Sequence, residues 1–83
     1  MKELKRERVA IIIASNLRIL RRKLNLTQEQ VAELAGIDRV LYTKYETAAS
    51  LMSIPKMVMV ANALNVTVDD LLFGVLEEMQ ENS

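Results

Sequence analysis

The sequence predicts an all-α domain of five short helices, and three observations support this fold class. First, the chain has 83 residues, which is the size of one small domain spanning residues 1–83. Second, 51% of the residues are apolar, and they can supply the dense core that so short a chain needs. Third, two Gly and one Pro offer little turn chemistry for a hairpin-rich β fold, whereas helix start signals recur along the chain.

The first helix is expected over residues 7–24. Apolar residues repeat along it at spacings of three and four and form one stripe: Val9, Ile12, Ile13, Leu17, Leu20 and Leu24. Leu4, Ile11 and Ile19 lie off this stripe. Either other helices cover these three residues, or they form a second apolar face that meets a partner subunit.

Two shorter helices are expected over residues 28–35 and 39–46. Thr27 and Gln30 have the spacing of a capping box, in which each side chain accepts a hydrogen bond from the other residue's backbone amide. Asp38 is the candidate N-cap of the second of these helices. The start of each helix is therefore encoded in the residues next to it.

The connection between these two helices is too short for anything but a sharp turn. Gly36 follows the earlier helix where a left-handed residue is required, and glycine adopts that conformation without a Cβ penalty. The small Ala32 faces inward four residues before it, and apolar residues fix the crossing of the helices: Val31, Ala35, Ile37, Tyr42 and Tyr45. This pattern predicts a helix-turn-helix over residues 28–46, a unit whose second helix fits the major groove of DNA.

The last two helices are expected over residues 54–64 and 68–80. Ser53 is the candidate N-cap of the first, and Pro55 lies in its first turn, where proline is tolerated. Thr67 and Asp70 repeat the spacing of a capping box before the second. The acidic pair at residues 69–70 is interpreted as helix-start chemistry and not as a metal site.

Several residue types that carry chemistry are absent from the chain. Without His or Cys it lacks the commonest general base, the commonest zinc ligands and any disulfide, so we expect no enzyme activity, no cofactor and no metal site. The longest unbroken apolar run, Val9–Ala14, is far shorter than the roughly 18 residues of a membrane-spanning helix. No signal-peptide cleavage site follows this run, so the sequence predicts a cytoplasmic protein with no membrane partner.

The formal net charge is zero, but the charges are unevenly distributed. Residues 1–46 contain ten basic and six acidic side chains, whereas residues 47–83 contain one basic and five acidic side chains. A basic half joined to an acidic half favours one face for a polyanion and another face for a different contact. The alternative is a dipolar surface without a function.

A series of motifs runs through the chain at fixed spacing. They are Leu17-Arg18-x-Leu20-Arg21, Leu26-Thr27-Gln28-Glu29-Gln30-Val31-Ala32, Gly36-Ile37-Asp38-Arg39 and Tyr42-x-x-Tyr45-Glu46, followed by Ser53-Ile54, Ala61-x-Ala63-Leu64-Asn65-Val66-Thr67 and Asp70-Leu71-Leu72. With these motifs, residues 17–72 resemble the Cro/lambda-repressor-like (XRE-type) helix-turn-helix family. The resemblance implies a compact five-helix lambda-repressor-like DNA-binding domain, here with a first helix that is extended at its N-terminus.

The resemblance also implies roles for individual residues. Those expected to contact double-stranded DNA, in the major groove or at the phosphates, are Thr27, Gln28, Arg39, Val40, Thr43, Lys44 and Thr47. Among them, Gln28 matches the family's phosphate contact, and Arg39 is placed to pair with guanine. Arg21 and Glu46 match a structural ion pair that holds the recognition helix. Tyr42 and Tyr45 are expected to bury their rings and keep their hydroxyls near the surface.

The segment after Glu46 departs from the family pattern. The family has a polar residue, Gly and a basic or polar run ending in Pro here, whereas this chain has Thr47-Ala48-Ala49-Ser50-Leu51-Met52, with no Gly, Lys, Arg or Pro. Phosphate contacts from this loop would have to come from the Thr47 hydroxyl or from backbone amides. The loop is also expected to need cover for its apolar side chains.

Two functions from different classes are consistent with these observations. The first is a sequence-specific transcriptional regulator, expected to be a repressor, that binds a two-fold operator as a homodimer. Its dimer interface is expected on the last helix, at Leu72, Val75, Leu76 and Met79. The alternative is an antitoxin or a subunit of a larger complex, in which the same fold binds a protein partner.

Overall fold

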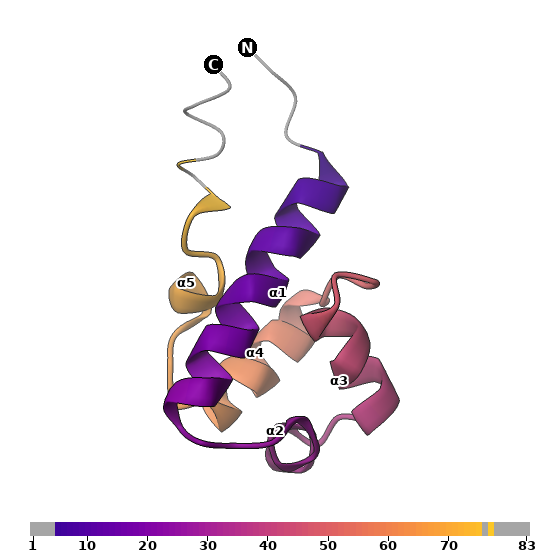
Figure 1. The fold of residues 1–83 in the computed structure, drawn as a ribbon, viewed down its shortest axis with the longest axis vertical. Coiled ribbons are helices and arrows are strands. Elements are labelled where there is room, and N and C mark those ends of the chain that lie inside the picture. Colours follow the sequence, from indigo (N-terminus) through magenta and orange to yellow (C-terminus); the bar gives the residue numbers. More distant parts are fainter. Residues whose placement is uncertain (1–4, 76, 78–83) are drawn as a thin grey trace.

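The computed structural model describes residues 5–75 and 77, which fold into a small bundle of helices (Figure 1). The helices are α1 (Arg6–Lys23), α2 (Gln28–Ala35), α3 (Arg39–Glu46), α4 (Ile54–Ala63) and α5 (Val68–Leu71). The all-α prediction is confirmed, since the described part of the chain contains no strand. The first four helices agree with their expected ranges to within one residue at either end.

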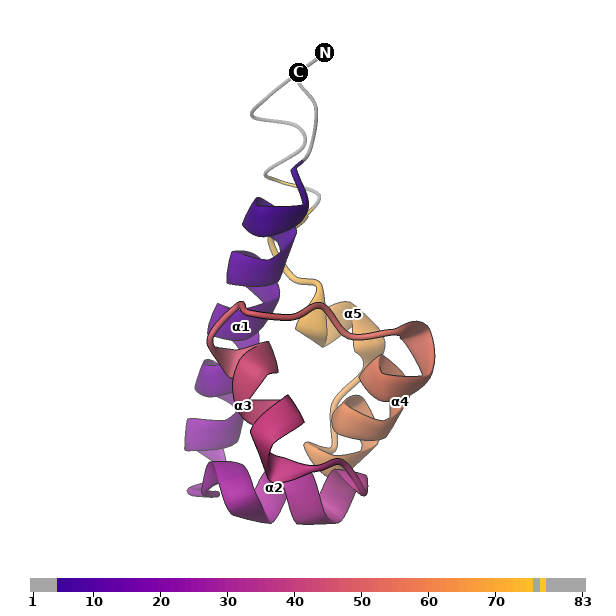
Figure 2. The ribbon, with the colours of Figure 1, turned by 90° about the vertical axis from the view of Figure 1, so that its right-hand side faces the viewer.

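Helix α1 is the longest element and forms one side of the bundle. It packs against α3 and α5, while α2 packs against α3 and α4. Figures 1 and 2 show α2 lying crosswise at one end of the bundle and the first turns of α1 extending past the other helices at the opposite end. The expected N-terminal extension of the first helix is thus present from Arg6 onward.

Each helix contributes a fully buried apolar side chain to one shared core. Leu17, Val31, Tyr42, Val60 and Leu71 come from α1 to α5 in that order, and each has 0% of its surface exposed. Full burial of such a side chain contributes about 1.5–3 kcal/mol, so the core is the main source of stability for short helices that would not persist alone. The apolar residues expected to fix the helix-turn-helix crossing are all buried in this cluster.

All four predicted N-caps are confirmed. The Thr27 hydroxyl accepts from the Gln30 amide at 3.1 Å, and the Gln30 side chain accepts from the Thr27 amide at 2.8 Å. Thr67 and Asp70 form the same pair of bonds at the start of α5. The Asp38 carboxylate accepts from two amides in the first turn of α3, and the Ser53 hydroxyl accepts from one at the start of α4.

The connections α1–α2 and α4–α5 repeat one local arrangement. In both, the sequence is Leu-Asn, an apolar residue and Thr, and the asparagines, Asn25 and Asn65, have the same φ of +56°. Asparagine tolerates this left-handed conformation better than other residues with a Cβ. The next residue then donates its amide back to the preceding helix, from Leu26 to Arg21 and from Val66 to Ala61.

The expectation of one continuous last helix over residues 68–80 is wrong. Helix α5 ends at Leu71, and a turn over residues 72–74 interrupts the helical backbone. The Asn16 side chain on α1 donates to the carbonyls of both Leu71 and Phe73 at 2.8 Å, which replaces helical partners for these groups. Gly74 completes the turn with a φ of +95°, a conformation that favours glycine.

Two expectations about surface coverage are decided by the structure. The loop after α3 needs no partner to cover it, because Met52 is buried and Leu51 is half-buried against the core. In contrast, Ile11 and Ile19 on α1 are each 50% exposed, so the described helices do not cover them as part of a wide stripe. Leu4 lies outside the described residues.

Within the described residues, none of the helices combines the length and the apolar character that crossing a bilayer requires.

Candidate nucleic-acid interface

The turn between α2 and α3 has the predicted geometry. Gly36 ends α2 with a φ of +71°, and the amide of Ile37 donates to the carbonyl of Ala32 at 2.9 Å. A Cβ on Gly36 would meet only the end of the Met59 side chain at 3.9 Å, which is an ordinary contact. Glycine is therefore needed here for its backbone conformation and not for lack of space.

Helix α3 has one face in the core and one face in solvent. Tyr42, Tyr45 and Glu46 are buried. Arg39, Val40 and Lys44 are exposed on the opposite side, with 64% of Val40 accessible. Val40 and Lys44 lie four residues apart on the same face of the helix, and Arg39 is exposed beside them at its first position.

The inward end of α3 is held by hydrogen bonds that converge on the Glu46 carboxylate. Arg21 on α1 donates through Nε at 2.7 Å and through Nη2 at 3.0 Å, which is a bidentate pair. Gln28 on α2 donates through Nε2 at 3.0 Å, and the Tyr42 hydroxyl donates to the second carboxylate oxygen. Three helices are thus joined at one buried side chain, and the predicted Arg21–Glu46 pair is brought together.

Several neighbouring groups complete this network. The remaining Arg21 nitrogen, Nη1, donates to the Leu26 carbonyl at 2.9 Å and so ties the α1–α2 connection to the same centre. Arg18, one turn earlier on α1, donates to the backbone carbonyl of Glu46. Every described buried side-chain nitrogen and oxygen has a hydrogen-bond partner. The end of α3 is therefore fixed to α1 through side chain and backbone together.

The environment of Glu46 keeps its carboxylate charged. Burial alone would raise its pKa, but the hydrogen bonds from Arg21, Tyr42 and Gln28 outweigh burial and hold the pKa of Glu46 below its ordinary value. The same hydrogen bond to Glu46 raises the pKa of Arg21. The pKa of the Tyr42 hydroxyl is also raised, mainly by burial and to a smaller extent by its hydrogen bond to Glu46. The network therefore consists of a carboxylate, a guanidinium and a neutral phenol.

The expectation that both tyrosine hydroxyls lie near the surface is wrong for Tyr42. Its hydroxyl is buried and bonded to Glu46, because the helical spacing of four residues places the two side chains on the same face. Sequence reasoning also missed the roles of Arg18 and Asn16. Asn16 could have been noticed as a polar residue beside the apolar stripe of α1, whereas Arg18 stands in a quoted motif without a role attached to it.

Gln28 and Thr43 are hydrogen-bonded to each other. The Thr43 hydroxyl donates to Gln28 Oε1 at 3.2 Å, and Gln28 Nε2 donates to Glu46. Both residues are half-buried, at the place where α2 and α3 meet. One Nε2 hydrogen remains that no hydrogen bond within the described residues uses, and it lies at the positive N-terminal end of α2.

The remaining predicted contact residues lie on the surface. Thr27 and Thr47 are exposed, Thr27 at the N-cap of α2 and Thr47 directly after α3. The Thr47 hydroxyl donates to the Lys44 carbonyl at 3.3 Å. Arg39 pairs with Glu29 of α2 at 3.8 Å, but both side chains are about two-thirds exposed and such a pair contributes about 0–1 kcal/mol.

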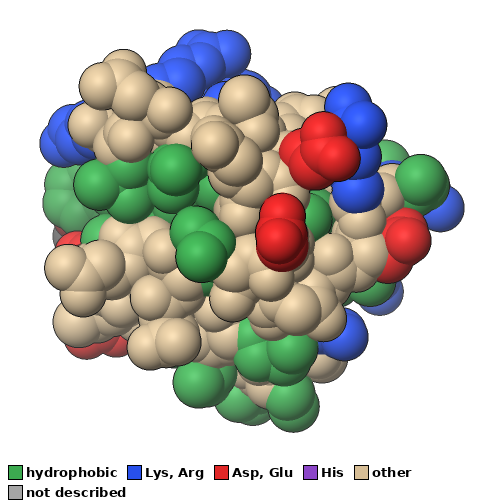
Figure 3. All heavy atoms as spheres, turned by 90° about the horizontal axis from the view of Figure 1, so that it is seen from below, with side chains coloured by type: hydrophobic (Ala, Val, Ile, Leu, Met, Phe, Trp, Pro, Cys, Tyr) green, Lys and Arg blue, Asp and Glu red, His purple; other side chains and the backbone are tan. Residues whose placement is uncertain are grey.

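The α2 end of the molecule does not carry a continuous basic surface. Figure 3 shows Lys and Arg side chains at its edges, with Asp and Glu side chains and hydrophobic groups between them. Glu29 and Glu33, both exposed on α2, contribute negative charge to the helix next to α3. Binding of a polyanion here would therefore depend on a few placed contacts more than on a general positive field.

No group of three or more His, Cys, Asp and Glu side chains within residues 5–75 and 77 is arranged to hold a metal ion.

Comparisons with known proteins agree with this geometry. The family described as helix-turn-helix matches residues 17–71. The chain is 37% identical over 51 residues to the cryptic phage CTXphi transcriptional repressor RstR of Vibrio cholerae, and this match spans 61% of the chain but 46% of RstR. It is 36% identical over 61 residues to the control protein C.SmaI of Serratia marcescens, covering 74% of the chain and 73% of that protein.

A solved structure shares the fold. The restriction-modification controller protein C.AhdI from Aeromonas hydrophila superimposes with a TM-score of 0.73 and 29% identity, over 75% of this chain and 94% of C.AhdI. The family match over residues 17–71 runs from the middle of α1 to the end of α5. The chain belongs to the XRE-type helix-turn-helix family.

Proposed function

We propose that this chain is a DNA-binding transcription regulator that acts as a homodimer on a two-fold operator. The observation that carries the proposal is the division of α3, whose outward residues Arg39, Val40 and Lys44 are exposed while Glu46 fixes its inward end. A helix presented in this way meets a major groove without ordering costs for its backbone. RstR is a transcriptional repressor and C.SmaI a control protein, which supports a regulator and favours repression.

The proposal assigns each contact residue a part. Arg39 and Val40, at the exposed start of α3, read base edges, with Arg39 suited to guanine and Val40 to a thymine methyl group. Lys44 and the outward part of Thr43 continue this face toward bases or phosphate. Gln28 donates its remaining Nε2 hydrogen to a phosphate and is held in place for this by Glu46. Thr27 and Thr47 supply hydroxyls on either side of the groove.

Dimerisation follows from how little one recognition helix can read. A single α3 covers only a few base pairs, and regulators of this geometry pair on half-sites about 34–36 Å apart. The C-terminal side of the domain remains the proposed interface, with Leu72 and Val75 half-buried there. Leu76 and Met79 lie outside the described residues. The proposal implies a cytoplasmic location, and no catalytic role.

Selection from a random DNA pool tests this function. We expect the chain to enrich a two-fold sequence, and its affinity for that duplex to exceed its affinity for a scrambled duplex by at least about 1000-fold. The logarithm of the affinity should fall linearly with the logarithm of the salt concentration, and the slope should steepen by about one for each phosphate contacted. If a folded chain enriches no sequence above the input pool, specific DNA binding is rejected.

That negative result would favour the second candidate function, an antitoxin or a subunit that binds another protein. The observation in its favour is the outer face of α4, where Ile54 is 76% and Val58 is 53% exposed one turn apart. Such a pair fits the apolar centre of a protein contact.

A further inference from the structure

Glu29 on α2 is an acidic side chain that lies next to the residue to which the proposed function assigns base reading. Its carboxylate oxygen Oε2 is 3.8 Å from Nη1 of Arg39, the first residue of α3. Within the described residues, Glu29 is the acidic side chain that forms an ion pair with Arg39. A carboxylate at this place repels phosphates, so its presence on a surface proposed to meet DNA calls for a physical reason.

Stability of the fold does not supply that reason. The side chains of Arg39 and Glu29 are 65% and 69% exposed, and water and salt screen a pair of this kind. The buried pair of Arg21 and Glu46 is the opposite case. An effect of Glu29 is therefore expected only when Arg39 leaves water and enters a groove, because the attraction between the two charges increases as screening by water is reduced.

The backbones that carry this pair are fixed by N-caps. Glu29 is the second residue of α2, directly inside the capping box that begins at Thr27. At the start of α3, Asp38 Oδ2 accepts from two backbone amides of the first turn at 3.0 and 3.2 Å. The Asp38 carboxylate is thus used by the backbone of α3, although it precedes Arg39 directly in the sequence. The carboxylate that meets Arg39 comes instead from α2, which packs against α3.

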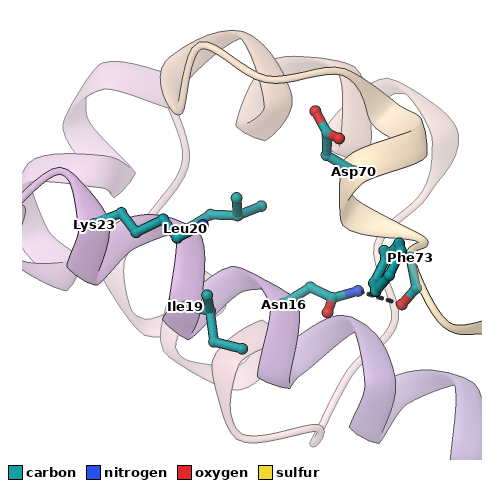
Figure 4. A pocket seen from close by; sticks show the side chains of 6 residues that line it. All are labelled: Asn16, Ile19, Leu20, Lys23, Asp70 and Phe73. Atoms are coloured by element: carbon teal, nitrogen blue, oxygen red, sulfur yellow. Dashed lines mark hydrogen bonds between the residues drawn. The ribbon is translucent and has the colours of Figure 1, made fainter.

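Opposite charges that lie near each other do not always pair on this protein. Lys23 on α1 and Asp70 on α5 both line the hollow between these two helices (Figure 4), but no ion pair joins them within the described residues. One oxygen of Asp70 accepts instead from the backbone amide of Thr67. The pairing of Glu29 with Arg39 therefore reflects how α2 and α3 cross and not merely the density of charge.

The contact with Glu29 leaves one edge of the Arg39 guanidinium available. In a guanidinium, the N–H groups of Nε and Nη2 point in parallel and can bind two acceptors at once. Arg21 uses this edge for the Glu46 carboxylate, at 2.7 and 3.0 Å. Glu29 contacts Nη1 of Arg39, and no hydrogen bond within residues 5–75 and 77 uses the parallel edge. That edge matches the O6 and N7 acceptors of guanine.

We propose that Glu29 is a positioning residue that turns Arg39 toward a base and away from the phosphates. An arginine side chain is long enough to reach either a base edge or the backbone of the same groove. A carboxylate beside Nη1 favours the orientation that presents the parallel edge, and it repels a phosphate that would compete for the guanidinium. The result is weaker binding to DNA of any sequence and stronger discrimination at one base pair. This inference deepens the proposed function and rests on it.

The test compares Glu29→Gln with Glu33→Gln in competition binding to three duplexes. Glu33 is the matched control, because it is an exposed glutamate one turn later on α2 and forms no ion pair within the described part of the chain. The duplexes are the selected site, the same site with the base pair assigned to Arg39 replaced, and a scrambled sequence. Each variant removes one negative charge, so both are expected to bind the scrambled duplex more tightly than the parent, by a similar factor.

Loss of discrimination is expected from Glu29→Gln alone. A bidentate arginine contact discriminates against a wrong base by roughly 5- to 150-fold. Glu29→Gln should lower the ratio of the affinities for the selected and altered sites by at least about threefold, and Glu33→Gln should keep it within about twofold. When Arg39→Ala is already present, Glu29→Gln should leave the ratio unchanged, because a positioning residue acts only through its partner. Urea titrations should show unchanged stability for both single variants, since exposed charges contribute little to it.

Two results would overturn the inference while the proposed function stands. The first is a selected site that Glu29→Gln distinguishes from the altered site as well as the parent chain does. The second is a change of the ratio that persists in the presence of Arg39→Ala, because Glu29 would then contact a base itself, as a carboxylate can at the amino group of cytosine. A parent chain that enriches no sequence rejects the proposed function and this inference together, so the selection step tells the two failures apart.

Discussion

Replacing Glu46 with Gln should remove a large part of the stability of the fold. The substitution keeps the shape of the side chain but takes away the charge that faces Arg21, and the Glu46 side chain is fully buried while only 13% of the Arg21 side chain is exposed. Removing one partner of a buried ion pair costs about 3–5 kcal/mol, because the other charge is left without compensation. The new amide would also place donor hydrogens where Arg21, Gln28 and Tyr42 already donate.

This cost is large compared with the total for so small a domain. A chain of 83 residues has an unfolding free energy of roughly 4–12 kcal/mol. Glu46→Gln should therefore lower the urea midpoint strongly, and a stabilising osmolyte can keep the variant folded for measurement. The free energy of unfolding is read from urea titrations followed by far-ultraviolet circular dichroism.

A double-mutant cycle isolates the contribution of the pair. Arg21→Met keeps the aliphatic stem of Arg21 but removes its donors, and alone it leaves the Glu46 carboxylate buried and short of partners. Glu46→Gln combined with Arg21→Met should lose less than the sum of the single losses, by at least about 1 kcal/mol. Losses that add within about 0.5 kcal/mol would show that the two residues act independently and would refute the reasoning.

Three further outcomes are expected. Arg39→Ala should lower affinity for the selected DNA by about 1–3 kcal/mol and relax one base position in a competition assay, while equal affinity would remove Arg39 from the base contacts. Ala48→Gly should raise the free energy of unfolding by about 0.5–1 kcal/mol, since Ala48 has a φ of +65°; Ala49→Gly, outside the left-handed region, should lower it. The pKa of Glu46 in the folded chain lies below its ordinary value. The charged carboxylate therefore stabilises the fold above the ordinary glutamate pKa of about 4.3, and this contribution is lost as the pH falls through the folded pKa. Acid should thus destabilise the parent chain more steeply than the Glu46→Gln variant.

The helix starts could be predicted because their chemistry is local. Thr27 and Gln30 are three residues apart, so the sequence alone places both partners of the capping box. The same holds for Gly36, whose left-handed conformation follows from its place after α2. Where a boundary depends on a distant residue, the sequence is silent. Helix α5 stops where Asn16 takes the carbonyls of Leu71 and Phe73, and these partners are 55 and 57 residues apart.

In the candidate site, too, contacts between residues far apart in the sequence could not be predicted from local patterns. The Arg21–Glu46 pair was expected from family resemblance and not from spacing, because 25 residues separate the two. Gln28 joins that pair only through the crossing of α2 and α3, which no linear pattern specifies, whereas Tyr42 lies four residues before Glu46 on the same helix. The left-handed backbone conformation of Ala48 was partly indicated by the resemblance, since the family has glycine in this loop. Phe73 is 72% exposed. This exposure could not be expected, because the sequence predicted one continuous helix through Phe73 and not the turn on which it lies.

The separation of α3 into a buried and an exposed face has a consequence for how such a chain can change its target. The fully buried contacts of the helix come from Tyr42, Tyr45 and Glu46, which are at most 4% exposed. If residues 39, 40 and 44 read DNA as proposed, their exchange alters which base pairs are preferred while leaving the folded state nearly as stable as before. A lineage can explore new operators through these positions without first acquiring compensating mutations, and an engineer can regraft them onto the same scaffold.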